Sequence, residues 1–241
     1  MPVKTFSEFT ATLLSVLNAR YSTDASFTTN SRVMQSALSV ARHDGLWLEF
    51  GVFQGTTIHL LAKAHPGDVF GFDSFLGLPE TWRVSKRNPG NRFDRAYTMK
   101  GSFSLMGNKP PRHLPNVKFV KGWFNETLPS FLLRHTSPVR FLHVDCDLYS
   151  SSSYVLKTIG PRLRNGTVIL FDELINYPGF EKHELLALWQ FLLQTQFDIR
   201  ILSGAAAHGS PVGEAWPQSV AVQLITRSRE FPSFPSLITA S

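Results

Sequence analysis

The chain has 241 residues and a net charge of +6, and 43% of its residues are apolar against 17% charged. This length is ample for one buried core, and this balance excludes a disordered protein. The single cysteine, Cys146, excludes an internal disulfide scaffold and a cysteine-based zinc site, so we expect a reducing, cytoplasmic location.

The N-terminal region predicts an amphipathic helix. Phe6, Phe9, Leu13 and Leu17 recur at helical spacing, and Glu8 interrupts any signal-peptide core. We expect residues 1–44 to form a helical cap on one domain that spans residues 1–241. No apolar run approaches the roughly 18 residues of a membrane helix, so no membrane association is expected.

From residue 46 onward, short apolar runs alternate with helical patterns, which is typical of βα units around a parallel sheet. The pattern predicts an α/β, doubly wound, Rossmann-like fold. Strands are expected at 46–51, 68–73, 117–121, 139–145, 166–171, 197–203 and 218–226, and helices at 56–65, 125–135, 149–159 and 180–194. Thr56 or Thr57, Asn125 and the serines at 150–153 are expected to cap three of these helices.

Residues 74–116 interrupt this alternation with five prolines and four glycines. A connection of this length in a compact domain predicts a lid insertion. Nine basic residues and one acid, Asp94, lie between Arg83 and Lys118, so the basic charge of the chain belongs to this segment. The lid favours an acceptor that bears a carboxylate or phosphate, unless the segment is a solvated surface loop. The tail after Arg227 is expected to be loose.

Polar residues at the carboxyl ends of the expected strands mark the ligand site, because ligands of open parallel sheets bind there. The first such group is Glu49, Gly51 and Gly55, which allow a tight turn into a helix N-terminus. Phe53 stands where a dinucleotide site needs a glycine, which disfavours a nicotinamide oxidoreductase. We expect Glu49 and the turn to hold the charged amino-acid end of a cofactor, unless this is an ordinary strand-to-helix turn.

Asp73 ends the next strand, 24 positions after Glu49, close to the roughly 20-residue offset of an acid that binds a ribose. Asp73 with Ser74 therefore predicts a ribose contact, and the alternative is a turn residue. Trp123 and Phe124 follow the third strand, where an adenine could lie on an aromatic face or the rings could simply fill the core.

Four carboxylates, Asp145, Asp147, Asp172 and Glu173, follow the fourth and fifth strands, which are neighbours in a doubly wound sheet. Carboxylates so close repel one another unless a cation such as Mg²⁺ binds them. We expect Asp145, Asp172 and Glu173 to ligate the metal, the alternative being capping of the following helices.

Asp145 is also the expected proton acceptor. His208, in the loop after the sixth strand, is an alternative general base or an ordinary loop histidine. His143 is expected to be a core residue, and Cys146 a core thiol on the opposite face of the strand from Asp145.

Five ordered motifs resemble the macrocin and mycinamicin sugar O-methyltransferase family. They are the segment from Glu49 to Gly55, Gly71-Phe-Asp-Ser-Phe-Leu-Gly-Leu-Pro79, Gly122-Trp-Phe-Asn-Glu-Thr-Leu-Pro129, Asp145-Cys-Asp-Leu-Tyr-Ser-Ser151 and Leu170-Phe-Asp-Glu173. The resemblance implies a class I fold whose seventh strand is antiparallel, S-adenosylmethionine with its ribose on Asp73, and a metal on Asp145 and the acids at 172 and 173. It further implies Mg²⁺-dependent methyl transfer to a hydroxyl of a small molecule such as a sugar or natural product. The family usually has Asp-Asp where this chain has Asp172-Glu173.

Two other functions remain open at this point. The basic segment favours a protein that binds nucleic acid or another anionic polymer, although we expect no nucleic acid as partner. The same cofactor fold also serves aminopropyl transferases. The first helix and the Phe-rich surface leave a homodimer open.

Overall fold

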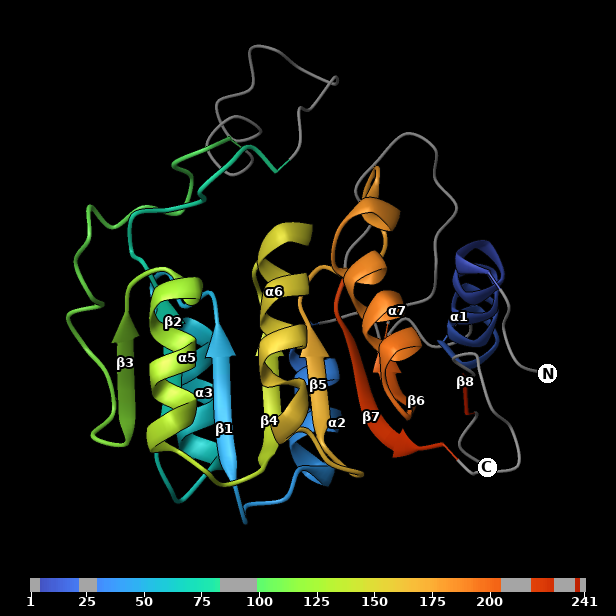
Figure 1. Cartoon of the computed structure of the whole chain (residues 1–241), viewed down its shortest axis with the longest axis horizontal. Helices are drawn as coiled ribbons and strands as arrows, with labels where there is room; N and C mark the ends of the chain where they lie inside the picture. The colour runs from blue at the N-terminus through green and yellow to red at the C-terminus, as the bar shows by residue number, and fades with distance from the viewer. Residues whose placement is uncertain (1–4, 22–29, 83–98, 205–217, 228–236, 239–241) are drawn as a thin grey trace.

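The computed structural model describes residues 5–21, 30–82, 99–204, 218–227 and 237–238. Within them a single sheet has the strand order β3-β2-β1-β4-β5-β7-β6-β8 (Figure 1). The strands are β1 (Leu46–Phe50), β2 (Val69–Asp73), β3 (Val117–Lys121), β4 (Val139–Val144), β5 (Val168–Phe171), β6 (Phe197–Gly204), β7 (Val220–Thr226) and β8 (Leu237–Ile238).

Strands β1 to β5 pair in parallel, and β7 runs antiparallel to both β5 and β6. The expected seven-stranded doubly wound sheet with an antiparallel last strand is therefore confirmed. The structure adds β8, which pairs in parallel with β6 within the tail that was expected to be loose.

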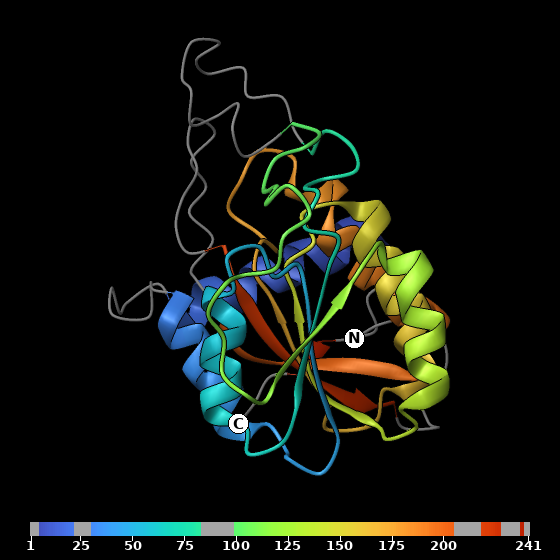
Figure 2. The same cartoon turned by 90° about the vertical axis from the view of Figure 1, so that its left-hand side faces the viewer.

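Helices cover both faces of the sheet (Figures 1 and 2). They are α1 (Phe6–Tyr21), α2 (Asn30–Val40), α3 (Thr56–Ala64), α5 (Phe124–Arg134), α6 (Tyr149–Ile159) and α7 (Glu184–Gln194). One core cluster joins the sheet to α1, α5, α6 and α7, and the other joins it to α2 and α3. Since both faces are covered, β1 and β5 are buried along their whole length, which explains why their residues are apolar except for Glu49.

The first helix follows the predicted spacing, because Phe9, Leu13 and Leu17 are fully buried. The sequence interpretation missed α2 and began the last helix too early. A short 3₁₀ turn at Phe180–Lys182 precedes α7, which begins at Glu184.

The expected side-chain caps are wrong at three helices. The residues at the N-cap positions of α3, α5 and α6 are Gly55, Trp123 and Leu148, and none of them makes a side-chain capping hydrogen bond. The amides at these helix starts therefore lack the side-chain acceptors that the sequence suggested.

The described parts of the predicted lid, 74–82 and 99–116, pair with each other above the sheet. Leu78 donates its N–H to the Ser102 carbonyl, and the Gly101 N–H donates to the Leu78 carbonyl, both at 2.9 Å. Gly77 lies at this crossing with a φ of +86°, where a Cβ would collide with backbone atoms of residues 101 and 102. The close approach of these two backbone segments thus requires glycine at position 77.

Within the described ranges, no helix is both long and apolar enough to span a bilayer.

Candidate active site

The carboxyl ends of four strands meet at one edge of the sheet. Hydrogen bonding continues one residue beyond the strands: Gly51 donates to the Phe72 carbonyl, Asp145 to the Phe50 carbonyl and Asp172 to the Val144 carbonyl, at 2.9 to 3.0 Å. The residues that follow β1, β2, β4 and β5 are therefore held in register. A cavity of about 640 Å³ opens at this edge.

The backbone of Gly51 lies directly against the loop that follows β4. Its φ is +93°, and a Cβ at this position would overlap the carbonyl oxygen of Asp145. Only glycine fits without moving one of the two loops. The turn between β1 and α3 therefore forms part of the cavity wall close to the β4 carboxylates.

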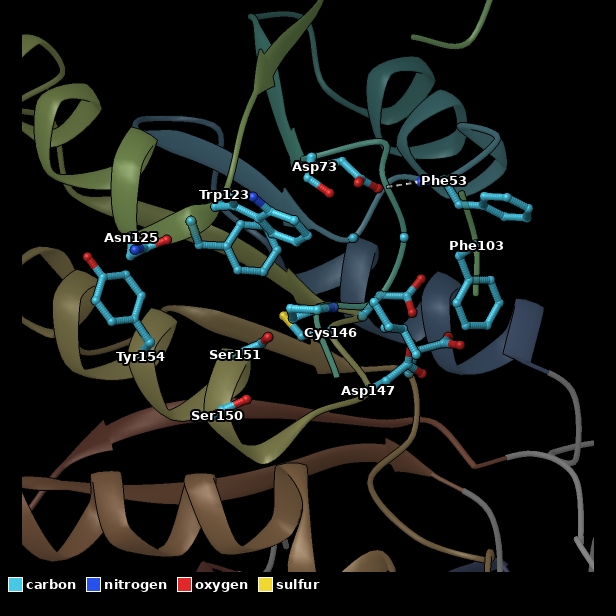
Figure 3. A pocket seen from close by; sticks show the side chains of 18 of the residues that line it. Phe53, Asp73, Phe103, Trp123, Asn125, Cys146, Asp147, Ser150, Ser151 and Tyr154 are labelled. Atoms are coloured by element: carbon cyan, nitrogen blue, oxygen red, sulfur yellow. Dashed lines mark hydrogen bonds between the residues drawn. The ribbon is translucent and has the colours of Figure 1, made fainter. Parts of the chain in front are cut away.

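Asp73 lines the cavity and fastens its wall at the same time (Figure 3). One carboxylate oxygen accepts the N–H groups of Val52 and Phe53, both at 2.8 Å, and the other accepts the N–H of Phe75 at 2.7 Å. A carboxylate has about four acceptor positions, so about one is left for a ligand hydroxyl. Asp73 thus stabilises the turn, which was the alternative role in the sequence analysis, and its contact with a ribose stays a prediction.

Ser74, Trp123, Phe124 and Asp145 also line the cavity, as does Gly51. Figure 3 shows Trp123, Asn125 and Tyr154 on one side, and Phe53 and Phe103 on the other side, with Phe53 hydrogen-bonded to Asp73. Gly55 is the N-cap of α3 and packs close to Pro110, just outside the cavity lining.

Glu49 is not brought to the cavity. Its side chain is fully buried within β1 and faces His143, with 3.8 Å between Glu49 Oε2 and His143 Nδ1. A side chain without access to the cavity cannot hold the end of a cofactor there. We therefore correct the expected role of Glu49 to that of a buried residue beneath the cavity floor.

Three carboxylates form the densest group of anionic side chains in the described residues. One oxygen each from Asp145, Asp147 and Glu173 lies within 4.8 Å of the other two. Burial, followed by the neighbouring Asp172 carboxylate, raises the pKa of both Asp145 and Glu173 well above their ordinary values. The Oε2 atom of Glu173 is buried and has no hydrogen-bond partner.

Asp172 lies at the edge of this group and not inside it. Its Oδ1 accepts a hydrogen bond of 3.2 Å from the Ser219 hydroxyl and lies 3.9 Å from His143 Nε2. Burial alone would raise the pKa of Asp172, but His143 together with hydrogen bonds from Glu173 and Ser219 outweighs burial and lowers it. The predicted ligands Asp145, Asp172 and Glu173 thus lie near one another. The structure adds Asp147, which the sequence analysis did not choose as a ligand, to the group of Asp145 and Glu173.

His143 is a buried residue, as expected, between two carboxylates. Burial by itself would lower its pKa, yet Asp172 and Glu49 on its two sides raise the pKa well above 6.5. Separations of 3.8 and 3.9 Å are ion-pair distances, longer than hydrogen bonds. A positive charge on this ring offsets part of the negative charge below the cavity.

Cys146 is a buried thiol, also as expected. Its Sγ donates to the Phe50 carbonyl at 3.6 Å, and burial raises its pKa well above the ordinary value. A thiol that keeps its proton is a poor nucleophile. The Cys146 N–H donates to Glu184 Oε1 at 3.3 Å.

Glu184 is a fully buried acid that the sequence analysis missed. Burial and the charge of Asp145 raise its pKa to about 8. Glu184 is the first residue of α7, a position where an acid is normally exposed to solvent, so the sequence did not indicate that this side chain is buried. His208 lies outside the described residues.

The family profile described as "Methyltransferase domain" matches residues 48–174, just over half of the chain. A curated relative is the 8-demethyl-8-(2,3-dimethoxy-alpha-L-rhamnosyl)-tetracenomycin-C 4'-O-methyltransferase of Streptomyces olivaceus, 28% identical over 140 residues, which are 52% of this chain and 51% of the relative. The chain thus matches about half the length of that relative.

Solved structures of similar fold include CalS11, a calicheamicin methyltransferase, at 20% identity and a TM-score of 0.55, covering 91% of this chain and 93% of that one. The O-methyltransferase NovP has 16% identity and a TM-score of 0.52, covering 92% and 100%. An O-methyltransferase from Bacillus cereus in complex with SAH has 13% identity and a TM-score of 0.52, covering 94% and 93%. The fold is that of class I methyltransferases, and the resemblance found in the sequence is confirmed at this level. The chain belongs to the family of methyltransferase domains.

Proposed function

We propose that the protein transfers a methyl group from S-adenosylmethionine to a hydroxyl of a sugar carried by a natural product, with a divalent cation as cofactor. The observation that carries this proposal is one cavity with Asp73 and Trp123 on one part of its wall and the group of Asp145, Asp147 and Glu173 on another. The named activity of the Streptomyces relative, which acts on a rhamnosyl tetracenomycin, supports the choice of acceptor.

The residues present fit the cofactor. The Gly51 backbone forms a wall that any Cβ would disturb, so a ligand can approach it closely. Asp73 has about one acceptor position left, enough for one ribose hydroxyl. Trp123 and Phe124 offer aromatic surface to the adenine.

The residues present also fit a hard divalent cation. Asp145, Asp147 and Glu173 supply only oxygen atoms, which Mg²⁺ prefers. Their raised pKa values and the unpartnered Glu173 Oε2 indicate a group with excess negative charge. Asp172, the fourth carboxylate, also lines the cavity.

When bound, the sulfonium cofactor supplies an electrophilic methyl group, and the cation lowers the pKa of a nearby hydroxyl. Gly51, Asp73 and Trp123 would hold this cofactor, and Asp145, Asp147 and Glu173 would hold the cation beside the acceptor hydroxyl. Asp145 accepts the proton of the acceptor hydroxyl. Asp145 lines the cavity, as a base that takes a proton from a bound acceptor must.

The test is methyl transfer in vitro. The purified chain is incubated with S-adenosylmethionine labelled in the methyl group and with a panel of rhamnosides, glucosides and phenols, with Mg²⁺ or with a chelator. We expect a labelled methyl ether of a glycoside in the presence of Mg²⁺ and a strong loss of product with the chelator.

Two results would contradict the proposal. Use of decarboxylated cofactor with an amine acceptor would indicate an aminopropyl transferase on the same fold. Tight, salt-dependent RNA binding without methyl transfer would favour an anionic-polymer binder.

A further inference from the structure

Two phenylalanines form an aromatic wall beside the carboxylate group. Phe53 belongs to the turn between β1 and α3, and Phe103 belongs to the segment above the sheet. Both line the cavity, and their ring centroids are 5.4 Å apart at 76°, an edge-to-face contact. Figure 3 shows both rings on the side of Asp147, away from Trp123 and Tyr154. Both rings therefore line the part of the cavity that adjoins the carboxylate group.

The backbone holds both rings in unusual positions. Phe53 has a φ of 45° and Phe103 a φ of 63°, in the left-handed region that residues other than glycine rarely adopt. Such conformations persist where the surroundings fix them, and they concentrate at ligand sites. The strain therefore marks both positions as ligand-facing candidates.

The surroundings that fix the two rings can be traced to one residue. Asp73 accepts the N–H of Phe53 and the N–H of Phe75, and the Phe75 carbonyl accepts the N–H groups of Leu105 and Gly107 at 3.0 and 2.7 Å. Asp73 thus connects the turn that carries Phe53 to the segment that carries Phe103. A wall that is rigid before binding loses little entropy when a ligand packs on it.

The charges on the cavity wall oppose an anionic ligand. Among the described lining residues none is basic, and the acids are Asp73, Glu126, Asp145, Asp147, Asp172 and Glu173. One divalent cation would neutralise only part of this charge. The described wall is therefore matched to an uncharged acceptor, in contrast to the anionic acceptor that the basic segment suggested.

We infer that Phe53 and Phe103 select the acceptor: an uncharged glycoside whose apolar aglycone packs against the two rings while a sugar hydroxyl faces the carboxylates. This inference rests on the proposed function and names its substrate class. It disfavours a sugar nucleotide, whose diphosphate would meet a wall of acids.

The test compares three probes that share one sugar: phenyl α-L-rhamnoside, methyl α-L-rhamnoside and thymidine diphosphate rhamnose. Their dissociation constants are measured by calorimetry, or by NMR titration for weak binding, on the full chain with SAH and Mg²⁺. We expect the phenyl glycoside to bind on the order of tenfold more tightly than the methyl glycoside, as one aromatic contact provides, and the nucleotide sugar to bind least.

Variants assign the preference to the wall. Phe103→Ala should bring the ratio of the two glycoside constants close to one, Phe103→Leu should retain part of it, and all variants should keep SAH binding. Leu133→Ala, at a side chain that is 82% exposed on α5, is the matched control and should change nothing. Tighter binding of the nucleotide sugar, no phenyl preference, or a preference that survives Phe103→Ala would overturn the inference. Failure of the unaltered chain to bind SAH would instead contradict the proposed function.

Discussion

Glu184 makes the stability of the metal-free protein depend on pH. Its side chain is fully buried, and its pKa is raised from 4.5 to about 8, first by burial and then by Asp145. Between these two values the folded chain keeps the proton that the unfolded chain has lost. Stability contributed by this proton is complete below pH 4.5 and is lost as the pH rises towards 8.

The size of this change in stability follows from the slope of the unfolding free energy against pH. One pH unit in this window corresponds to about 1.4 kcal/mol, so a rise from about pH 5.5 to about pH 7.5 removes about 3 kcal/mol. Glu184→Gln has the same shape and keeps an acceptor for the Cys146 N–H, but it cannot titrate. The variant should therefore gain about 3 kcal/mol over the unaltered chain between these two pH values.

Urea unfolding at both pH values, followed by tryptophan fluorescence with a chelator present, gives the two free energies of unfolding. Titrating groups that do not interact with Glu184 are common to both proteins and cancel in the difference. Exposed Glu181→Gln, three positions earlier, is the control and should show no such pH dependence. A stability difference between Glu184→Gln and the unaltered chain that is equal at both pH values would refute the assigned pKa.

Three further predictions concern the cavity wall. Gly51→Ala should destabilise the fold and weaken SAH binding by more than Gly166→Ala does. Gly166 is the control because it has a similar φ of +87° but no atom near the position of a Cβ. Equal losses in the two variants would contradict the role given to the close contact between Gly51 and Asp145. Asp73→Ala removes the charged acceptor of three N–H groups, and a hydrogen bond to a charged group contributes about 1.5–3 kcal/mol net. Tm and SAH affinity should therefore both fall, whereas exposed Asp68→Ala should leave them unchanged. Asp145→Asn should lower the methyl-transfer rate by about a hundredfold or more with SAH affinity retained in calorimetry, and a loss of SAH affinity of the same size would reassign this residue to cofactor binding.

The sheet could be predicted because its signals are local. The run Val168–Phe171 is apolar throughout and Leu46–Phe50 is apolar except for Glu49, which follows from burial on both faces of a central parallel strand. The positions at the carboxyl ends then follow from the topology rule, and this brought Asp73 and Asp145 to one cavity. β8 has only two residues, too few to show a period.

The parts of the site that depend on three-dimensional packing could not be predicted. Glu49 follows the family motif, yet the pairing of β1 with β4 places it against His143 and away from the cavity. Asp147 joins the carboxylate group through a φ of 61°, a left-handed conformation that no local sequence pattern at this position predicts. Phe103 reaches the cavity across about fifty residues of chain from Phe53, so no spacing rule connects the two rings.

A crystal structure of the complex with SAH and Mn²⁺ tests the central claim most directly, because manganese reports its position by anomalous scattering. We predict SAH in the cavity, with its ribose at Asp73, and an anomalous peak bounded by Asp145, Asp147 and Glu173. An SAH molecule elsewhere, or a cavity that holds SAH while manganese stays away from these three carboxylates at saturating concentration, would contradict it.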